Sequence, residues 1–379
     1  MRTKLYSFLT IIAFFVGVLP ASAGLLRLGI VWTNNEVLLY WPTNALTFSF
    51  VLQSSTNLAS TNWGFATDAV PATYGSQTAV TVSNTLAARF FRLIMVSTTT
   101  ADGMAFIPAG SFTIGDTLDG ESDAIPTNVY VSAFYMDTNL VSLSQWMGVY
   151  SYATNHGYSF VYAGAGKAAN NPVQTVDWYD CVKWCNARSQ QAGLRPVYYT
   201  NAGLTQVYTS GETTNFFANW TANGYRLPTE AEWEKAARGG LSGQRFPWGL
   251  TISETQANYD GDTAISYDLG PNGYNALFDT AYPYTSPVGY FAANGYGLYD
   301  MAGNVDEWCW DWFAGTPYPT GSPYLGGSDP RGPATGTFRV LRGGYWGYLA
   351  IYARCADRSL GDYPSNGDAY NGFRCVRGL

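Results

Sequence analysis

Long irregular stretches rich in glycine, asparagine and tyrosine dominate the chain beyond residue 103. Only two segments there have a clear helical pattern: one spans Trp178–Gln191, and the other begins at Thr229. Thr229 and Glu232 have the spacing of a capping box, and Pro228 prevents an earlier start. A third helix is expected near Ser144–Tyr150. Because so little of the backbone is periodic, side-chain packing must hold this part together, and 26 of the chain's 29 Tyr and 10 of its 13 Trp lie there and supply large rings for it.

Residues 24–97 have a different pattern, with short apolar stretches separated by turn residues. The stretches are rich in aromatic and β-branched residues and have the alternation of strands; examples are Glu36–Trp41, Leu46–Leu52 and Ala88–Ile94. Several short strands in so few residues predict a small all-β sandwich, followed by a polar linker at residues 98–103. The segment holds no catalytic cluster, so a binding or spacer module is expected.

Residues 1–23 have the features of a secretory signal peptide. Arg2 and Lys4 precede an apolar run at Phe8–Leu19, and Ala21–Ala23 has the small residues of a cleavage site. The alternative is a membrane anchor, but the run is shorter than the roughly 20 residues that span a bilayer, and no cysteine follows the cleavage site. We therefore expect a secreted or cell-surface protein with no transmembrane segment. The net charge of −7 and the lack of a basic cluster argue against a nucleic-acid partner.

Eight short motifs follow one another between residue 104 and the end of the chain. They are Phe106–Phe112, Phe134–Asp137, Asn171–Trp178, Tyr225–Trp233, Phe246–Gly249, Gly297–Asn304, Val340–Gly344 and Gly372–Cys375. Their order and spacing resemble the sulfatase-modifying factor, or formylglycine-generating enzyme, family. The resemblance implies an α+β, C-type-lectin-like fold over residues 104–379, with little regular secondary structure. Arg226, Trp233 and Arg342 lie in these motifs and are expected to be structural.

The resemblance also implies structural calcium. Oxygen ligands suit Ca²⁺, and the segment after residue 299 offers two carboxylates separated by turn residues. Asp306 stands where family members usually have Trp. A second site would begin at Asn258 with the Tyr259 carbonyl, although Asp279 is about one residue out of register for the acidic ligand. The alternative for the first segment is a solvated acidic turn. The ligands of the first site would be Asp300, Glu307 and the carbonyls of Gly303 and Val305.

The family's oxidase converts a substrate cysteine to formylglycine with two cysteines that bind copper. Both would lie in the interval Tyr345–Ala353, which has no cysteine here. The related sulfoxide synthases bind iron through several histidines, and this chain has only His156. Neither copper nor iron is therefore expected, and the chain is expected not to be an enzyme. An oxidoreductase of either type, using other residues, is the alternative.

The chain has five cysteines, at positions Cys181, Cys185, Cys309, Cys355 and Cys375. By the resemblance, Cys185 and Cys375 form a disulfide. Cys355 matches a structural cysteine whose usual partner position is Ala237 here. The remaining two have no family partner and could pair with each other or with Cys355. The odd number leaves at least one thiol unpaired within a monomer.

The family motifs do not account for the residue types at many positions of the segment Tyr345–Asn371. Its expected framework residues are Trp346, Ala350, Arg354, Cys355, Ala356, Arg358 and Pro364. The other positions are mainly Tyr, Gly, Leu, Ile, Asp, Ser and Asn, with no Lys, Glu, Gln or Met. Codons ending in a pyrimidine encode each of these types, as in the variable proteins of diversity-generating retroelements. The alternative is that polar loops are tolerated here in a chain that is rich in tyrosine throughout.

Tyr, Ser, Gly, Asn and Asp make adaptable contacts in antibody loops. We therefore expect a ligand face for an unknown protein or glycan. A structural surface protein stabilised by calcium is the remaining alternative. The expected face residues are Tyr345, Gly347, Tyr348, Leu349, Ile351, Tyr352, Asp357, Ser359, Leu360, Asp362, Tyr363, Asp368 and Tyr370.

Overall fold

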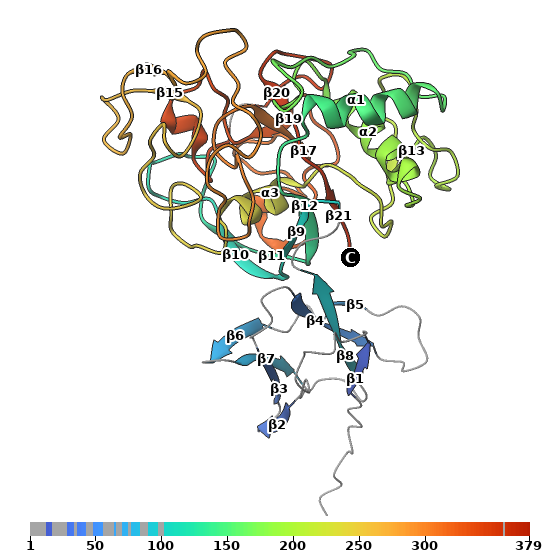
Figure 1. Ribbon diagram of the computed structural model, residues 1–379. Helices are drawn as coiled ribbons and strands as arrows, with labels where there is room; N and C mark the ends of the chain where they lie inside the picture. The colour runs from blue at the N-terminus through green and yellow to red at the C-terminus, as the bar shows by residue number, and fades with distance from the viewer. Residues whose placement is uncertain are drawn as a thin grey trace, which may run out of the picture. The chain divides into compact units, whose positions relative to one another are not determined.

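The computed structural model divides the chain into two compact units (Figure 1). One comprises residues 1–101 with 108–111, and the other residues 102–107 with 112–379. The structure describes residues 13–16, 29–33, 36–42, 48–55, 64–65, 70–74, 77–83, 90–97, 102–358 and 361–379.

The described part of the N-terminal unit is all β, as predicted. It contains two four-stranded sheets, of order β1-β8-β4-β5 and β2-β3-β7-β6. β1 lies within the expected signal peptide and pairs in parallel with β8, so cleavage after Ala23 would remove it from its sheet. The strands are β1 (Ala13–Val16), β2 (Gly29–Thr33), β3 (Glu36–Pro42), β4 (Phe48–Ser55), β5 (Gly64–Phe65), β6 (Val70–Tyr74), β7 (Gln77–Ser83) and β8 (Phe90–Ser97).

The C-terminal unit has short strands in small sheets. The strand orders of these sheets are β10-β11-β18, β21-β12-β9, β19-β17-β20, β13-β14 and β15-β16. The strands are β9 (Met104–Ile107), β10 (Gly110–Ile114), β11 (Thr127–Val131), β12 (Phe134–Asp137), β13 (Tyr198–Tyr199), β14 (Phe217–Ala218), β15 (Asp260–Gly261), β16 (Gly273–Tyr274), β17 (Asp306–Trp312), β18 (Gly327–Ser328), β19 (Arg339–Arg342), β20 (Asn371–Gly372) and β21 (Val376–Arg377). The helices are α1 (Leu143–Thr154), α2 (Trp178–Gln191), α3 (Glu230–Ala237) and the 3-10 helices η1 (Pro323–Leu325) and η2 (Ala350–Ala353).

Local capping chemistry explains where the helices begin. Asp177 accepts a hydrogen bond from the Asp180 N–H at the start of α2 (2.6 Å). At α3, Thr229 and Glu232 form the expected capping box. α1 begins one residue earlier than expected, after the cap Ser142, and ends four residues later. α1 packs against α2, with the rings of Trp146 and Trp184 stacked.

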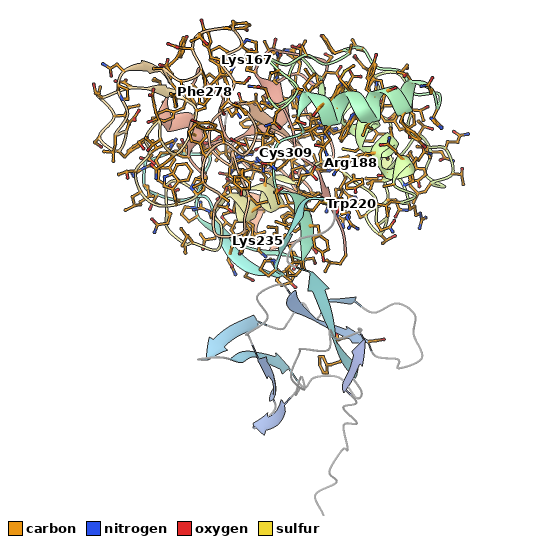
Figure 2. The ribbon with its side chains drawn as sticks, in the orientation of Figure 1. Lys167, Arg188, Trp220, Lys235, Phe278 and Cys309 are labelled. Carbon is orange, nitrogen blue, oxygen red and sulfur yellow. The ribbon has the colours of Figure 1, made fainter. Side chains whose placement is uncertain are left out.

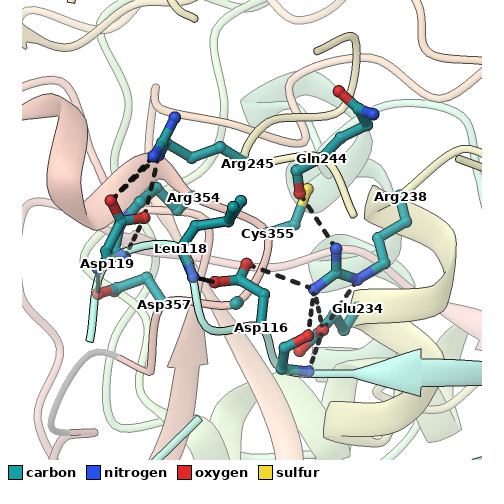
Figure 3. Close-up of polar contacts among 12 residues, drawn as sticks. Asp116, Leu118, Asp119, Glu234, Arg238, Gln244, Arg245, Arg354, Cys355 and Asp357 are labelled. Carbon is teal, nitrogen blue, oxygen red and sulfur yellow. Dashed lines mark hydrogen bonds and ion pairs between the residues drawn. The ribbon is translucent and has the colours of Figure 1, made fainter. Parts of the chain in front are cut away.

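Buried ion pairs surround α3, which contacts β11, β17 and β19. Glu234 accepts hydrogen bonds from Arg238 (Nη2–Oε1, 2.7 Å), Arg342 (Nη2–Oε2, 2.6 Å) and the Gly115 N–H (2.7 Å). Figure 3 shows the Arg238 side of this network. One turn earlier, Glu230 pairs with Arg358 (2.7 Å). The bonds to Gly115, Arg342 and Arg358 join segments more than 100 residues apart to this one helix.

The α+β fold with little regular secondary structure is therefore confirmed. Arg226, Trp233 and Arg342 are buried in it: Arg226 forms a bidentate pair with Glu232, and the Arg342 guanidinium lies over the Trp233 ring. In the described part of the chain, no helix is both long and apolar enough to cross a membrane.

Candidate functional site

After β19 the chain reverses through Gly343 and Gly344. Their φ angles of +95° and +73° lie in the left-handed region that glycine adopts without strain. A Cβ at Gly344 would lie 2.9 Å from the Tyr352 carbonyl oxygen. The segment turns again where the Tyr348 N–H bonds the Tyr345 carbonyl (3.0 Å), and then enters η2. This close return requires glycine and brings the two ends of the segment 344–352 together.

Burial divides the segment Tyr345–Tyr370 into the two classes that the sequence suggests. The expected framework residues, from Trp346 to Pro364, are all buried. Most expected face residues are half-buried, and Tyr363 is exposed. The half-buried residues are Tyr345, Gly347, Tyr348, Leu349, Ile351, Tyr352, Asp362, Asp368 and Tyr370.

Four tyrosines form a continuous row of ring contacts, called here the tyrosine row: Tyr370, Tyr345, Tyr348 and Tyr352. The Tyr345 ring stacks on Tyr370, with centroids 4.6 Å apart and planes at 22°. The Tyr345 and Tyr348 centroids are 4.2 Å apart, and those of Tyr348 and Tyr352 are 4.5 Å apart. The row therefore joins two segments, 345–352 and 368–370, into one half-exposed aromatic surface.

The aromatic surface extends to residues that the sequence analysis did not assign to it. The buried Trp346 contacts Tyr345 (5.4 Å between centroids) and also Tyr274, Tyr282 and Tyr284 (5.6, 5.5 and 4.9 Å). Tyr274 and Tyr282 are exposed, Tyr282 at 63%. No local pattern pointed to these tyrosines, because they lie about 60 or more positions before the segment that they adjoin.

Asp357 does not belong to the exposed face to which the sequence assigned it. It is only 6% exposed, its Oδ1 lies 3.3 Å from Arg354 Nη2, and its carbonyl accepts a hydrogen bond from Arg342. The ion pair with Arg354 and the hydrogen bond from Arg342 hold it beneath the surface. Ser359 and Leu360, also assigned to the face, lie outside the described residues.

Carboxyl groups lie beside the tyrosine row. Asp306 is buried, its N–H donates to the Tyr370 carbonyl (2.9 Å), and burial raises the pKa of its carboxyl well above the usual range. Burial is the largest cause that raises the pKa of the Tyr345 and Tyr348 hydroxyls, and the negative charge of the Asp306 carboxylate is the second. Asp362 is half-buried, and burial also raises the pKa of its carboxyl. The phenols therefore remain neutral and able to donate hydrogen bonds at physiological pH.

A family model for the sulfatase-modifying factor enzyme 1-like domain matches residues 91–379. The chain belongs to this family. It is 35% identical to the formylglycine-generating enzyme of Thermomonospora curvata, over 73% of this chain and 93% of that protein. It is 32% identical to the chaperone protein LppX of Paenibacillus barcinonensis, over 75% of this chain and 90% of that protein. Among solved structures it is similar to Treponema denticola variable protein 1, with a TM-score of 0.57 and 29% identity over 73% and 95% of the two chains.

In this sulfatase-modifying factor domain, the two carboxylates of the first expected calcium site differ in their partners. Both oxygens of Glu307 bind Arg374 (Oε2–Nε 2.7 Å, Oε1–Nη2 2.8 Å). Asp300 Oδ2 accepts from the Gly289 N–H (2.7 Å), but its buried Oδ1 has no hydrogen-bond partner. Burial raises the pKa of Asp300 to about 6. An unpaired buried oxygen fits a cation, whereas Arg374 already neutralises Glu307.

The backbone near Asp300 adopts irregular turns, and the Gly303 carbonyl accepts one hydrogen bond, from the Val305 N–H (3.1 Å), which leaves one lone pair of that oxygen for a cation. Gly303 has a φ of +76° and forms a bridge with Asn258, whose carbonyl accepts the Asn304 N–H (2.8 Å). No group of three or more His, Cys, Asp or Glu side chains in the described residues could hold a metal ion. A calcium ion at this loop would therefore need the Gly303 and Val305 carbonyls beside Asp300.

The second expected calcium site has fewer matching groups. The Asn258 side-chain amide donates to the Tyr284 carbonyl (2.8 Å), and the Tyr259 hydroxyl donates to Asp268. Asp279, the downstream acidic residue, is exposed.

All five cysteines are buried free thiols in the structure. Burial raises the pKa of Cys355 to about 12 and that of Cys181 and Cys309 well above the usual range. These three are therefore thiols at neutral pH, unlike the thiolates that react or bind soft metals. His156 is exposed near the end of α1, where its ring stacks on Tyr152.

The Cys185 and Cys375 sulfurs lie 3.5 Å apart, in contact but farther than the roughly 2.05 Å of a disulfide bond, so a small side-chain movement would allow oxidation to join them. In an oxidising compartment we expect them to form a disulfide between α2 and the segment before β21. Peptide mapping by mass spectrometry without reduction should then recover the two cysteines in one linked fragment. Alkylation of both residues in the secreted, unreduced protein would contradict this prediction.

Proposed function

We propose that this protein is a secreted, non-catalytic binding protein that presents the tyrosine row and its adjoining loops as a ligand face. The observation that carries the proposal is the division of Tyr345–Tyr370 into a buried framework and half-exposed Tyr, Gly and Asp positions. A framework of this kind keeps the backbone fixed while the exposed side chains vary. Family membership supplies the scaffold, and the proposed signal peptide would deliver it to the cell exterior.

The chemistry of the row supports a role in recognition. Tyrosine offers a large rigid ring and one hydroxyl, and it loses little conformational entropy on binding. Tyr345 is held by contacts with Tyr370, Tyr348 and Trp346, so it is ordered before a ligand arrives. Order present before binding reduces the entropic cost of association.

A binding screen tests the face directly. The mature chain is applied to arrays of cell-surface proteins and glycans, beside the double variant Tyr348→Ala/Tyr352→Ala. We expect specific interactions of the wild type that the double variant loses. Interactions that the variant retains in full would show that the tyrosine row is not the ligand face.

Diversification by a retroelement is proposed as the origin of the face. It is supported by the residue types between Tyr345 and Asn371 and by the similarity to Treponema denticola variable protein 1. Sequencing the encoding locus should reveal a template repeat with Asn codons at the variable positions, beside a reverse transcriptase gene. Purine-ending codons at these positions and no repeat would contradict this mechanism while leaving the binding proposal in place.

An oxidoreductase of the formylglycine-generating or sulfoxide-synthase type is the second candidate. The identity to the Thermomonospora enzyme favours it. The absence of cysteine from Tyr345–Ala353 and the single histidine oppose it. Oxygen consumption with a cysteine peptide, after loading with copper or iron, would establish this alternative and contradict a purely binding role.

Structural calcium is proposed at Asp300 with the Gly303 and Val305 carbonyls. A ligand that binds only the folded state stabilises it by RT ln(1 + [L]/Kd), or about 1.4 kcal/mol at ten times Kd. We therefore expect Ca²⁺ to raise the melting temperature relative to EGTA, and Asp300→Ala to abolish the rise. Glu212→Ala, which removes an exposed carboxylate outside both expected calcium sites, is the control and should respond as the wild type does. Identical melting of the wild type in Ca²⁺ and EGTA would contradict the site.

A further inference from the structure

A cavity of about 220 Å³ lies between the segment before β14, strand β17 and the loop 331–334. Its walls include Phe216, Trp220, Trp310 and Trp312, and none of its lining residues belongs to the proposed ligand face. Trp220 is labelled in Figure 2. The Trp310 ring meets Trp220 and Phe216 edge to face, with centroids 5.2 and 5.6 Å apart. The walls are therefore large flat rings held in place by one another.

Arg339, the first residue of β19, also lines the cavity and is only 3% exposed. Its guanidinium lies between two rings, 3.7 Å from the Trp178 centroid and 3.5 Å from the Trp312 centroid. It donates to the Trp310 carbonyl, while its Nε has no hydrogen-bond partner. Burial lowers the pKa of Arg339 to about 9, because the nearby Tyr179 and Asp311 only partly offset the loss of water around its charge.

Arg339 differs from the other buried arginines of the described chain because it has no ion-pair partner. Each of the others has a carboxylate within ion-pair distance; the pairs are Arg188–Asp137, Arg226–Glu232, Arg238–Glu234, Arg342–Glu234, Arg354–Asp119, Arg358–Glu230 and Arg374–Glu307. Arg339 has no such partner among the described residues. The nearby Asp311 is beyond ion-pair distance, and burial raises the pKa of its own carboxyl. A buried charge without a counter-charge is costly, which points to an anion supplied from outside.

A second guanidinium reaches the same cavity from the surface. Arg331 is exposed, lies 4.2 Å from the Trp220 centroid, and forms no ion pair in the described part of the chain. Arginine forks bind carboxylates in two parallel hydrogen bonds, and stacking on a ring fixes the plane of the fork. The cavity thus has one buried and one exposed arginine, both held against tryptophan rings.

The geometry points to a binding site for a small carboxylate carried on a single six-membered ring, in the cavity of Arg339, Arg331, Trp220 and Trp310. The acid group binds the two guanidiniums, and the ring body stacks on the aromatic walls. The cavity is smaller than the roughly 300–1,000 Å³ of pockets that hold drug-sized ligands, which limits the occupant to about one ring. A uronic acid of a glycan and a free aromatic acid share this chemistry.

Probes of matched shape test the site in the full mature chain. Glucuronate is compared with glucose, and benzoate with benzamide, by calorimetry and by tryptophan fluorescence, which reports on the cavity walls. We expect at least one acid to bind ten-fold or more tightly than its neutral counterpart. Which acid does so distinguishes the glycan source from the aromatic one. Equal binding of acid and neutral probes, or no binding of either acid, overturns the proposal.

Single substitutions test whether Arg331 and Arg339 bind the acid group. Arg331→Gln removes an exposed charge and leaves the buried core intact, and it should weaken the preferred acid at least ten-fold. Arg195→Gln removes an exposed arginine outside the cavity and should have no effect. Arg339→Lys keeps a positive charge but loses the planar fork, so it should also weaken binding. An unchanged affinity in Arg331→Gln, with the fold intact by circular dichroism, would refute the assignment.

Discussion

Replacing Glu234 by glutamine is expected to destabilise the C-terminal domain by about 3–5 kcal/mol, the usual cost of breaking a buried ion pair. The change leaves Arg238 and Arg342 without the carboxylate that both now share. The next nearest carboxylates are Asp116, 3.9 Å from Arg238, and Glu230, 3.7 Å from Arg342. Each of these carboxylates is farther from its arginine than Glu234 is, so both buried positive charges would lose their close partner and meet an amide instead.

Urea unfolding followed by tryptophan fluorescence measures this loss. Glu212→Gln is the matched control, since Glu212 is exposed and the substitution is chemically the same. The control should unfold at the wild-type urea concentration. If Glu234→Gln also unfolds there, the pairs around α3 are not the structural centre that their burial indicates.

The sequence predicted those parts of the fold that local chemistry determines. α2 has the expected bounds because Asp177 caps it, and α3 begins at the expected capping box. Both signals lie within a few residues of the helix they start. The family motifs predicted the rest of the fold class, but through resemblance rather than periodicity.

Partners far apart in the chain could not be predicted. Glu234 meets Arg342 across 108 positions, and Glu307 meets Arg374 across 67. In a fold with few regular elements, no repeat or register relates such positions, so only the complete structure shows that Arg374 neutralises an expected calcium ligand. The same holds for the candidate face. Asp357 resembles its variable neighbours in residue type, and only the folded structure shows that Arg342, 15 positions away, bonds its carbonyl and that its side chain is buried.

At the candidate face, Tyr345→Ala is expected to weaken binding of any ligand found there by about 30-fold or more. Tyrosine hot spots contribute about 2 kcal/mol or more, and they lie at the centre of an interface. Tyr345 occupies the centre of the tyrosine row, since its ring contacts Tyr370 on one side and Tyr348 on the other. Its removal therefore deletes one contact surface and loosens the two rings beside it.

The matched control for this prediction is Tyr290→Ala. Tyr290 is 54% exposed and packs on Phe278 and Phe291, and it has no ring contact with the row. Surface plasmon resonance with the captured ligand should give a wild-type Kd for the control and a raised Kd for Tyr345→Ala, mainly through faster dissociation. Equal losses in the two variants would mean that general aromatic surface, rather than the row, holds the ligand. An unchanged Kd in Tyr345→Ala would place the binding site elsewhere on the domain, because a central, pre-ordered ring cannot be removed from a true interface without cost.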